Sequence, residues 1–235
     1  PLPTGFLTLT INPEEEVSEG AQWRIDEWDW FASGETRVVS AGTHHLEFSD
    51  VPGWITPVPQ QVTIVEGETT SASGTYTPQT GSLRIIITPS AAIDGGAKWR
   101  RVGTETWQDS GATESEIRVG SHSVEFRDIE NWWKPANRIV MIEYNKMKTE
   151  TATYSPHTGS LQVIITPQAA IDGGARWRRA GTSTWRSSGT TESGVPVGQQ
   201  AIEFSPVPGW TKPANQTVTI FVNQTTYAIG TYTPP

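Results

Sequence analysis

The sequence predicts an all-β chain of three tandem β-sandwich modules, each of seven strands, linked into a semi-rigid rod. Three observations support this prediction: a repeat of about 78 residues, short runs in which apolar and polar residues alternate, and turn residues at regular intervals. Strands separated by turns every 8–12 residues or so are typical of β-sandwiches. A repeat of roughly this length indicates a tandem array rather than one large domain.

Tryptophans define the repeat. The first set consists of Trp23, Trp99 and Trp177, which are 76 and 78 residues apart. A second set consists of Trp30, Trp107 and Trp185, and a third of Trp54, Trp132 and Trp210. We therefore divide the chain into a first copy (1–78), a second copy (79–156) and a third copy (157–235).

Short proline-containing joints separate the copies, at residues 77–80 and 155–158. Proline stiffens a linker. We therefore expect the copies to be held semi-rigidly rather than as beads on a flexible string.

The third copy shows the expected strands most clearly. Leu161, Val163 and Ile165 alternate with outward-facing residues and form the first strand. Further strands are expected at 175–178, 184–186, 195–197, 200–204 and 218–222, followed by a last strand that carries Tyr232. Pro196 indicates that 195–197 is an edge strand. No stretch of the chain shows a helical period.

Tryptophans are expected to supply much of the core, because a module of this size without cysteine has only a small apolar interior and no disulfide. The second set is expected to contribute, and the first and third sets are assigned to the structural core: Trp23, Trp99, Trp177, Trp54, Trp132 and Trp210. The alternative is a sugar-stacking platform, but recurrence in every copy favours the core.

An arginine follows each tryptophan of the first set: Arg24, Arg100 and Arg178. Because side chains alternate along a strand, these arginines face away from the core. We expect each to stack on an aromatic ring or pair with a neighbouring strand. A ligand clamp is the alternative.

The order of these signals resembles bacterial PEGA-like repeats, small modules related to the carboxypeptidase-regulatory and transthyretin-like folds. In the third copy the resemblance is carried by residues 159–167, 174–177, 188–189, 196–198, 202–204, 209–210 and 230–232. The tryptophans and the Trp-Arg pair depart from the family pattern. The resemblance implies an Ig-like sandwich that serves as a cell-surface or exported spacer or interaction module, and it implies no reaction.

Composition and motifs argue against catalysis. The chain has no cysteine, and it contains no nucleophile elbow, phosphate-binding loop or His-Glu-x-x-His motif. His44 and His122 occupy equivalent positions, where the third copy has Gln200. We therefore predict that the chain is not an enzyme and has no cofactor or metal site.

Charge and hydropathy exclude two classes of partner. The net charge of −8 disfavours binding to nucleic acid or to an anionic membrane. No apolar run is long enough to span a bilayer, so membrane insertion is not expected.

Acidic loops in the first copy leave calcium binding open. Clustered carboxylates in loops can hold Ca²⁺, and the chain has two such clusters, Glu14, Glu15, Glu16 and Glu19 in one and Asp26, Glu27 and Asp29 in the other. The other copies lack the first cluster. We therefore favour a solvated acidic loop.

Two sets of residues are candidates for contacts with other molecules. Trp28 and Trp133 are each unique to their copy and are expected to be exposed aromatic contacts. The candidate interface consists of outward-facing apolar residues of the second and third copies, where the first copy has polar residues such as Thr10 and Thr63 on the same strands. Such a patch indicates an interface, and its members are Ile86, Ile139, Met141, Ile164 and Phe221.

Charge changes steeply along the chain. The first copy has 2 basic and 12 acidic side chains, the second has 10 and 10, and the third has 5 and 3. Such polarity favours head-to-tail association, which makes open filaments when the rotation between subunits does not close.

We therefore predict an extracellular or cell-surface structural protein, a spacer or filament subunit that self-associates. One alternative is a surface adhesion or glycan-binding module, with a cell-surface protein or glycan as partner. Another is a non-catalytic accessory segment of a larger secreted enzyme. Because residue 1 is Pro, we take the chain to be a processed form or a segment.

Overall fold

A computed structural model describes residues 2–14 and 20–235 of the chain. The described residues form two compact units. One comprises residues 2–14, 20–85, 111–124 and 138–150, and the other comprises 86–110, 125–137 and 151–235. The second copy contributes to both units. The division into three modules at residues 78 and 156, and their arrangement as a rod, stay predictions.

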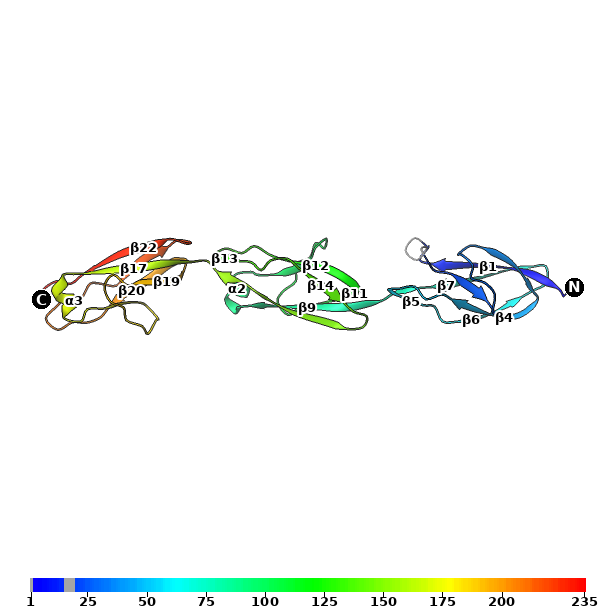
Figure 1. Cartoon of the computed structure of the whole chain (residues 1–235), viewed down its shortest axis with the longest axis horizontal. Helices are drawn as coiled ribbons and strands as arrows, with labels where there is room; N and C mark the ends of the chain where they lie inside the picture. Colours follow the sequence, from blue (N-terminus) through cyan, green and yellow to red (C-terminus); the bar gives the residue numbers. More distant parts are fainter. Residues whose placement is uncertain (1, 15–19) are drawn as a thin grey trace. The chain divides into compact units, whose positions relative to one another are not determined.

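The first copy folds into two three-stranded sheets (Figure 1). In the first sheet, β1 lies between β3 and β7, antiparallel to β3 and parallel to β7. In the second sheet, β4 lies between β2 and β6 and is antiparallel to both. The strands are β1 (Thr4–Asn12), β2 (Trp23–Ile25), β3 (Thr36–Ser40), β4 (Gly42–Phe48), β6 (Gln60–Ile64) and β7 (Thr69–Thr75).

Alternation along the strands builds one core between these two sheets. On β1, Leu7, Leu9 and Ile11 are buried, whereas the residues between them are not. They belong to the same apolar cluster as Trp23 and Leu46 from the second sheet. The prediction of an all-β sandwich is confirmed.

The third copy has the same arrangement. Its central strand β17 is antiparallel to β19 and parallel to β22, and β22 lies beside β17 in Figure 1. The second sheet has the order β18–β20–β21. The elements are β17 (Thr158–Thr166), α3 (Gln168–Asp172), β18 (Trp177–Arg179), β19 (Thr191–Pro196), β20 (Gly198–Phe204), β21 (Gln216–Ile220) and β22 (Thr225–Thr231).

The second copy repeats this element order. Its sheets have the orders β11–β9–β15 and β10–β12–β14. The elements are β9 (Thr80–Thr88), α2 (Ser90–Asp94), β10 (Trp99–Arg101), β11 (Thr113–Arg118), β12 (Gly120–Phe126), β14 (Arg138–Ile142) and β15 (Met147–Thr153).

One detail of the predicted strands is wrong, and the structure adds two short helices that the sequence did not predict. The sandwich has six main strands rather than seven, because the strand expected at 184–186 is reduced to a single bridge between Trp177 and Arg186. In addition, one-turn helices α2 and α3 follow the first strands of the second and third copies. Five residues are too few for a helical period to show in the sequence.

A recurring Ser-Gly pair ties the loop before the third strand to the first strand. In the third copy, Ser188 Oγ accepts a hydrogen bond from the backbone N–H of Ile165 at 2.9 Å. Gly189 donates its N–H to the carbonyl of Val163 and has a φ of 77°. A left-handed backbone favours glycine, which explains why this pair recurs.

A buried tyrosine closes each copy. The hydroxyl of Tyr232 donates to the carbonyl of Ser205 at 2.6 Å, and that of Tyr154 to the carbonyl of Arg127 at 2.7 Å. Burial, with the negative charge of Asp128, raises the pKa of Tyr154 to about 12. The hydroxyl therefore stays protonated, as a donor must, well into the alkaline range.

Candidate functional site

The first tryptophan set lies inside the sandwich. Trp23, Trp99 and Trp177 are each 0% exposed. Their indole N–H groups donate to backbone carbonyls, as Trp177 does to Ser187 at 3.1 Å. This bond satisfies the one polar atom that burial would otherwise leave unpaired.

The third set lies at one end of each core. Trp54 is 8% exposed, but Trp132 and Trp210 are only half-buried. The expectation that Trp132 and Trp210 are core residues is therefore wrong. Trp210 packs against the cluster from its edge, because the bend at 207–210 brings it to the end of the sandwich.

Two members of the second set, Trp30 and Trp185, lie on the surface and Trp107 is half-buried, which also corrects the sequence expectation. Trp30 is 39% exposed and Trp185 is 38% exposed. The missing strand explains this position, because these residues follow a loop rather than an inward-facing strand. In each copy the arginine after the first-set tryptophan stacks on the second-set ring: Arg24 on Trp30 at 4.8 Å, Arg100 on Trp107 at 4.4 Å, and Arg178 on Trp185 at 4.5 Å.

The same arginines pair with a glutamate across the sheet. Arg24 pairs with Glu47, Arg100 with Glu125 and Arg178 with Glu203. The structural interpretation of the arginines is confirmed: each both stacks and pairs. A Trp–Arg–Glu group thus covers the outer face of the second sheet in every copy.

The two aromatic residues expected to be exposed lie at the surface. Trp28 is 44% exposed and Trp133 is 56% exposed. Trp133 also contacts His157 across the second joint, with the ring centroids 4.1 Å apart. Its free face remains a candidate contact surface.

The five candidate interface residues do not share one face of a sheet. Ile164 (36% exposed) lies on β17, in the sheet β19–β17–β22 of the third copy. Ile139 (75%) and Met141 (55%) lie on β14, in the sheet β10–β12–β14 of the second copy. Phe221 follows β21 and is 55% exposed, and Ile86, on β9, is half-buried. Whether any of them meets another chain stays a prediction.

Sequence reasoning missed two exposed neighbours of Ile164. Ile229 on β22 stands opposite Ile164, and Tyr227 opposite Gln162. Tyr227 is 68% exposed and Ile229 61% exposed. The sequence could have indicated that both residues face outward, because the first copy has serine at the two equivalent positions of β7. Tyr144 is also exposed, at 49%.

His44 lies in a polar cluster at the side of the first sandwich. Its Nδ1 is 2.7 Å from Oδ2 of Asp26, and its Nε2 is 2.8 Å from the carbonyl of Ser40. Burial alone would lower the pKa of His44, but these hydrogen bonds and the charge of Asp26 outweigh it and raise the pKa above 6.5. Both ring nitrogens face acceptors, which the imidazolium satisfies.

This geometry predicts pH-dependent stability of the first copy. Because the pKa of His44 is higher in the folded state, protonated His44 stabilises the fold. This stabilisation is complete below the pKa of the unfolded state, about 6.5, and is lost as the pH rises through the pKa of the folded state. Amide hydrogen exchange is base-catalysed, so its intrinsic rate rises with pH. At pH 8 we expect first-copy amides to exchange faster than this rise in the intrinsic rate alone explains. Gln200, which stands at the equivalent position, donates to the carbonyl of Pro196 without titrating. His44→Gln should therefore remove the dependence; an unchanged pH profile in that variant would contradict the assignment.

A second polar cluster fills the equivalent side of the third copy. Glu192 is 7% exposed, and its Oε1 accepts hydrogen bonds from Arg179 at 2.9 and 3.0 Å. Arg186 approaches the same oxygen at 3.1 Å. Arg179 also donates to Gln200 at 3.2 Å. The cluster joins β18 of one sheet to β19 of the other, and it fills the side of the sandwich where a seventh strand is absent.

Each joint is held by backbone hydrogen bonds through one residue. At the first joint, Gln79 donates its N–H to the carbonyl of Gly53, and its own carbonyl accepts from Val119. His157 does the same at the second joint, between Asn131 and Val197. Short ribbons accompany these bonds: β5 (Trp54–Ile55) pairs with β8 (Thr77–Pro78), and β13 (Trp132–Trp133) pairs with β16 (Ser155–Pro156).

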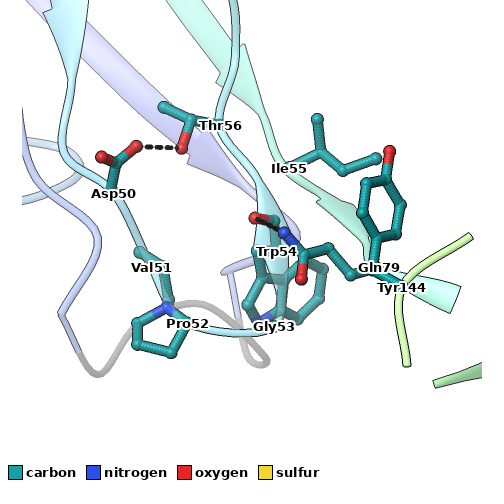
Figure 2. A pocket seen from close by; sticks show the side chains of 9 residues that line it. All are labelled: Asp50, Val51, Pro52, Gly53, Trp54, Ile55, Thr56, Gln79 and Tyr144. Carbon is teal, nitrogen blue, oxygen red and sulfur yellow. Dashed lines mark hydrogen bonds between the residues drawn. The ribbon is translucent and has the colours of Figure 1, made fainter. Parts of the chain in front are cut away.

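A pocket of about 490 Å³ lies at the first joint (Figure 2). It is lined by residues 50–56, Gln79 and Tyr144. Figure 2 shows the loop from Asp50 to Gly53 on one side and Tyr144 on the other, with Trp54 between them. Arg118 lies over the Trp54 ring at 4.7 Å and holds it in place.

No metal-binding cluster of three or more His, Cys, Asp or Glu side chains is found in the described part of the chain. Of the acidic residues considered for calcium, Glu15, Glu16 and Glu19 lie outside the described residues. Asp26 is already engaged by His44 and by the N–H of His45. Residues 2–14 and 20–235 contain no helix of the length and apolarity that a bilayer crossing requires.

No protein-family model matches the sequence, so the resemblance to PEGA-like repeats is not confirmed. No curated protein matches it either. Among solved structures, the chain is similar to the Bacillus anthracis TIE protein, with a TM-score of 0.67 and 12% identity over 98% of this chain and 51% of that one. This similarity shows a shared β-sandwich fold, and the chain spans about half the length of the TIE protein.

Two pilins also match with lower TM-scores. They are BcpA, the major pilin subunit of Bacillus cereus (TM-score 0.43, 10% identity, 99% of both chains), and a streptococcal ancillary pilin (TM-score 0.33, 10% identity, 99% of this chain and 100% of that one). These TM-scores are too low to carry a conclusion about this chain.

Proposed function

We propose that the chain is a non-catalytic structural protein of the cell exterior, a spacer or filament subunit that associates head to tail. The observation that carries this proposal is the joint. Gln79 and His157 each bond backward to one copy and forward to the next through the backbone. Joints of this kind are what a spacer built from tandem repeats requires.

The sides of the sandwiches support end-to-end rather than lateral association. An outer strand with free backbone groups invites pairing with another chain. In the third copy, Gln216 donates to the carbonyl of Ile229 at 2.8 Å, and Thr226 donates to the carbonyl of Thr219 at 2.9 Å. Gln60 and Thr70 make the equivalent bonds in the first copy. These side chains occupy carbonyls that an incoming strand would need.

The charge difference between the copies supplies the direction. The first copy carries 12 acidic and 2 basic side chains, and the third carries 3 and 5. Opposite ends of two molecules therefore attract, and two acidic ends repel. Charge of this kind governs orientation and encounter rate more than affinity.

Sedimentation velocity tests this proposal. At low salt we expect oligomers that grow with protein concentration, shrink with added salt and appear as filaments by negative-stain microscopy. Glu66→Lys with Glu68→Lys, in the exposed loop after β6, should weaken assembly, whereas the same changes at Glu105 and Glu116 of the second copy should weaken it less. A monomer at millimolar concentration and low salt would refute head-to-tail association.

A glycan-binding surface module is the second candidate, favoured by the exposed ring of Trp133. A glycan array probed with the whole chain tests it. Hits that Trp133→Ala abolishes would support this candidate, and an array without hits would remove it. An accessory role within a larger secreted enzyme is compatible with either candidate.

A further inference from the structure

The pocket at the first joint has a composition that the spacer role does not require. We propose that the pocket formed by residues 50–56, Gln79 and Tyr144 binds a ring of a neutral sugar. This inference is independent of head-to-tail association.

The apolar walls suit the C–H face of a pyranose. Tyr144 is 49% exposed and Ile55 is 40% exposed, so neither side chain is needed to fill the core. Val51 and Pro52 line the opposite side. Ligand sites typically combine such apolar walls with a few convergent polar groups, and a tyrosine offers a flat ring together with a hydroxyl.

The polar groups suit hydroxyl groups. Asp50 Oδ1 accepts from Thr56 Oγ1 at 2.8 Å, which leaves Oδ2 as an acceptor for a sugar hydroxyl. Gln79 Nε2 donates to the carbonyl of Trp54 at 3.3 Å and thereby fixes the amide, whose Oε1 is a second acceptor. Figure 2 shows both bonds.

The charge of the pocket defines the class of sugar. Among its nine described lining residues there is one carboxylate, Asp50, and no Lys, Arg or His. An anionic sugar would meet a like charge, and none of these nine lining residues carries a cation to compensate it. A neutral sugar gains charge-assisted hydrogen bonds from the same carboxylate.

The second joint lacks these features, although its backbone bonds are the same. Lys134 replaces Thr56 and pairs with Asp128, the equivalent of Asp50, at 2.7 Å. His157 and Val222 stand where the first joint has Gln79 and Tyr144. A purely structural joint needs no tyrosine or free carboxylate, because the second joint holds without them.

Ligand titration of the ¹⁵N-labelled whole chain tests the proposal. The probes are methyl β-glucopyranoside and N-acetylglucosamine, with glucuronate as the anionic comparison. We expect fast-exchange shifts of the Gln79 side-chain amide and of the Trp54 indole at millimolar concentrations of at least one neutral probe, and smaller shifts with glucuronate.

Two variants locate the site. Tyr144→Val, which introduces the residue that the third copy carries, should weaken binding about tenfold, and Asp50→Asn should weaken it as well. Tyr227→Val, which removes an equally exposed tyrosine elsewhere, should leave binding unchanged. Both pocket variants should keep wild-type amide dispersion.

Three results would each overturn the proposal. They are the absence of shifts at tens of millimolar of every neutral probe, shifts that persist unchanged in Tyr144→Val, and glucuronate binding as tightly as the neutral sugars. None of these results bears on self-association, which sedimentation measures separately.

Discussion

Replacing Trp177 with alanine is expected to lower the free energy of unfolding of the third copy by about 3–5 kcal/mol. Trp177 is 0% exposed and belongs to one apolar cluster with strands of both sheets. The substitution removes the largest side chain of that cluster and leaves a cavity that the surrounding strands can fill only partly. It also removes the donor to the carbonyl of Ser187. In a small module this loss is a large share of the total stability.

Urea unfolding followed by hydrogen exchange of third-copy amides measures this effect. The matched control is Trp185→Ala. Trp185 is 38% exposed and only stacks on Arg178, so its removal should cost about 1 kcal/mol or less. Similar losses in the two variants would mean that Trp177 does not support the core.

Replacing Glu192 with glutamine is expected to destabilise the third copy by about 3–5 kcal/mol, because breaking a buried ion pair leaves charge without a partner. Glu192 Oε1 is the shared acceptor of Arg179 and Arg186, whose side chains are only 19% and 20% exposed. A neutral amide accepts one or two of these bonds but does not balance two guanidinium charges. The link between β18 and β19 is therefore weakened.

Glu203→Gln is the control for this prediction. Glu203 pairs with Arg178, which lies on β18 next to Arg179, but the side chain of Glu203 is 28% exposed. An ion pair accessible to solvent contributes about 1 kcal/mol or less. The double variant Arg179→Ile, Glu192→Gln tests the mechanism, because the first copy carries Ile25 at the position of Arg179. It should recover part of the loss. If Glu192→Gln and Glu203→Gln cost the same, the cluster is not a buried link between the sheets.

The sequence alone determined the all-β character and the positions of most strands. Apolar residues such as Leu161, Val163 and Ile165 alternate with a period of two, and this local signal survives any tertiary context in which one face is buried. The repeat added a second, independent signal, since a strand found in one copy is expected in the others. The same alternation predicted that Arg178 and Trp177 lie on opposite faces of β18.

Only the tertiary structure decided which aromatic residues are inside. Trp185 recurs as regularly as Trp177, but the missing seventh strand leaves it on a loop, where the nearest partner is an arginine. Recurrence reports a repeated environment without saying whether that environment is core or surface. For the same reason, recurrence did not predict that Trp132 and Trp210 are half-buried.

The tertiary structure also decided where distant residues meet. A side chain added at Gly159 would lie 2.2 Å from the carbonyl oxygen of Phe221, 62 residues along the chain. Asp50, Gln79 and Tyr144 reach one pocket, and Glu192 reaches two arginines, from separate segments. Periodicity reports the direction of a side chain from its own strand. The neighbour it meets depends on how two sheets are stacked and joined, and no local pattern in the sequence contains that information.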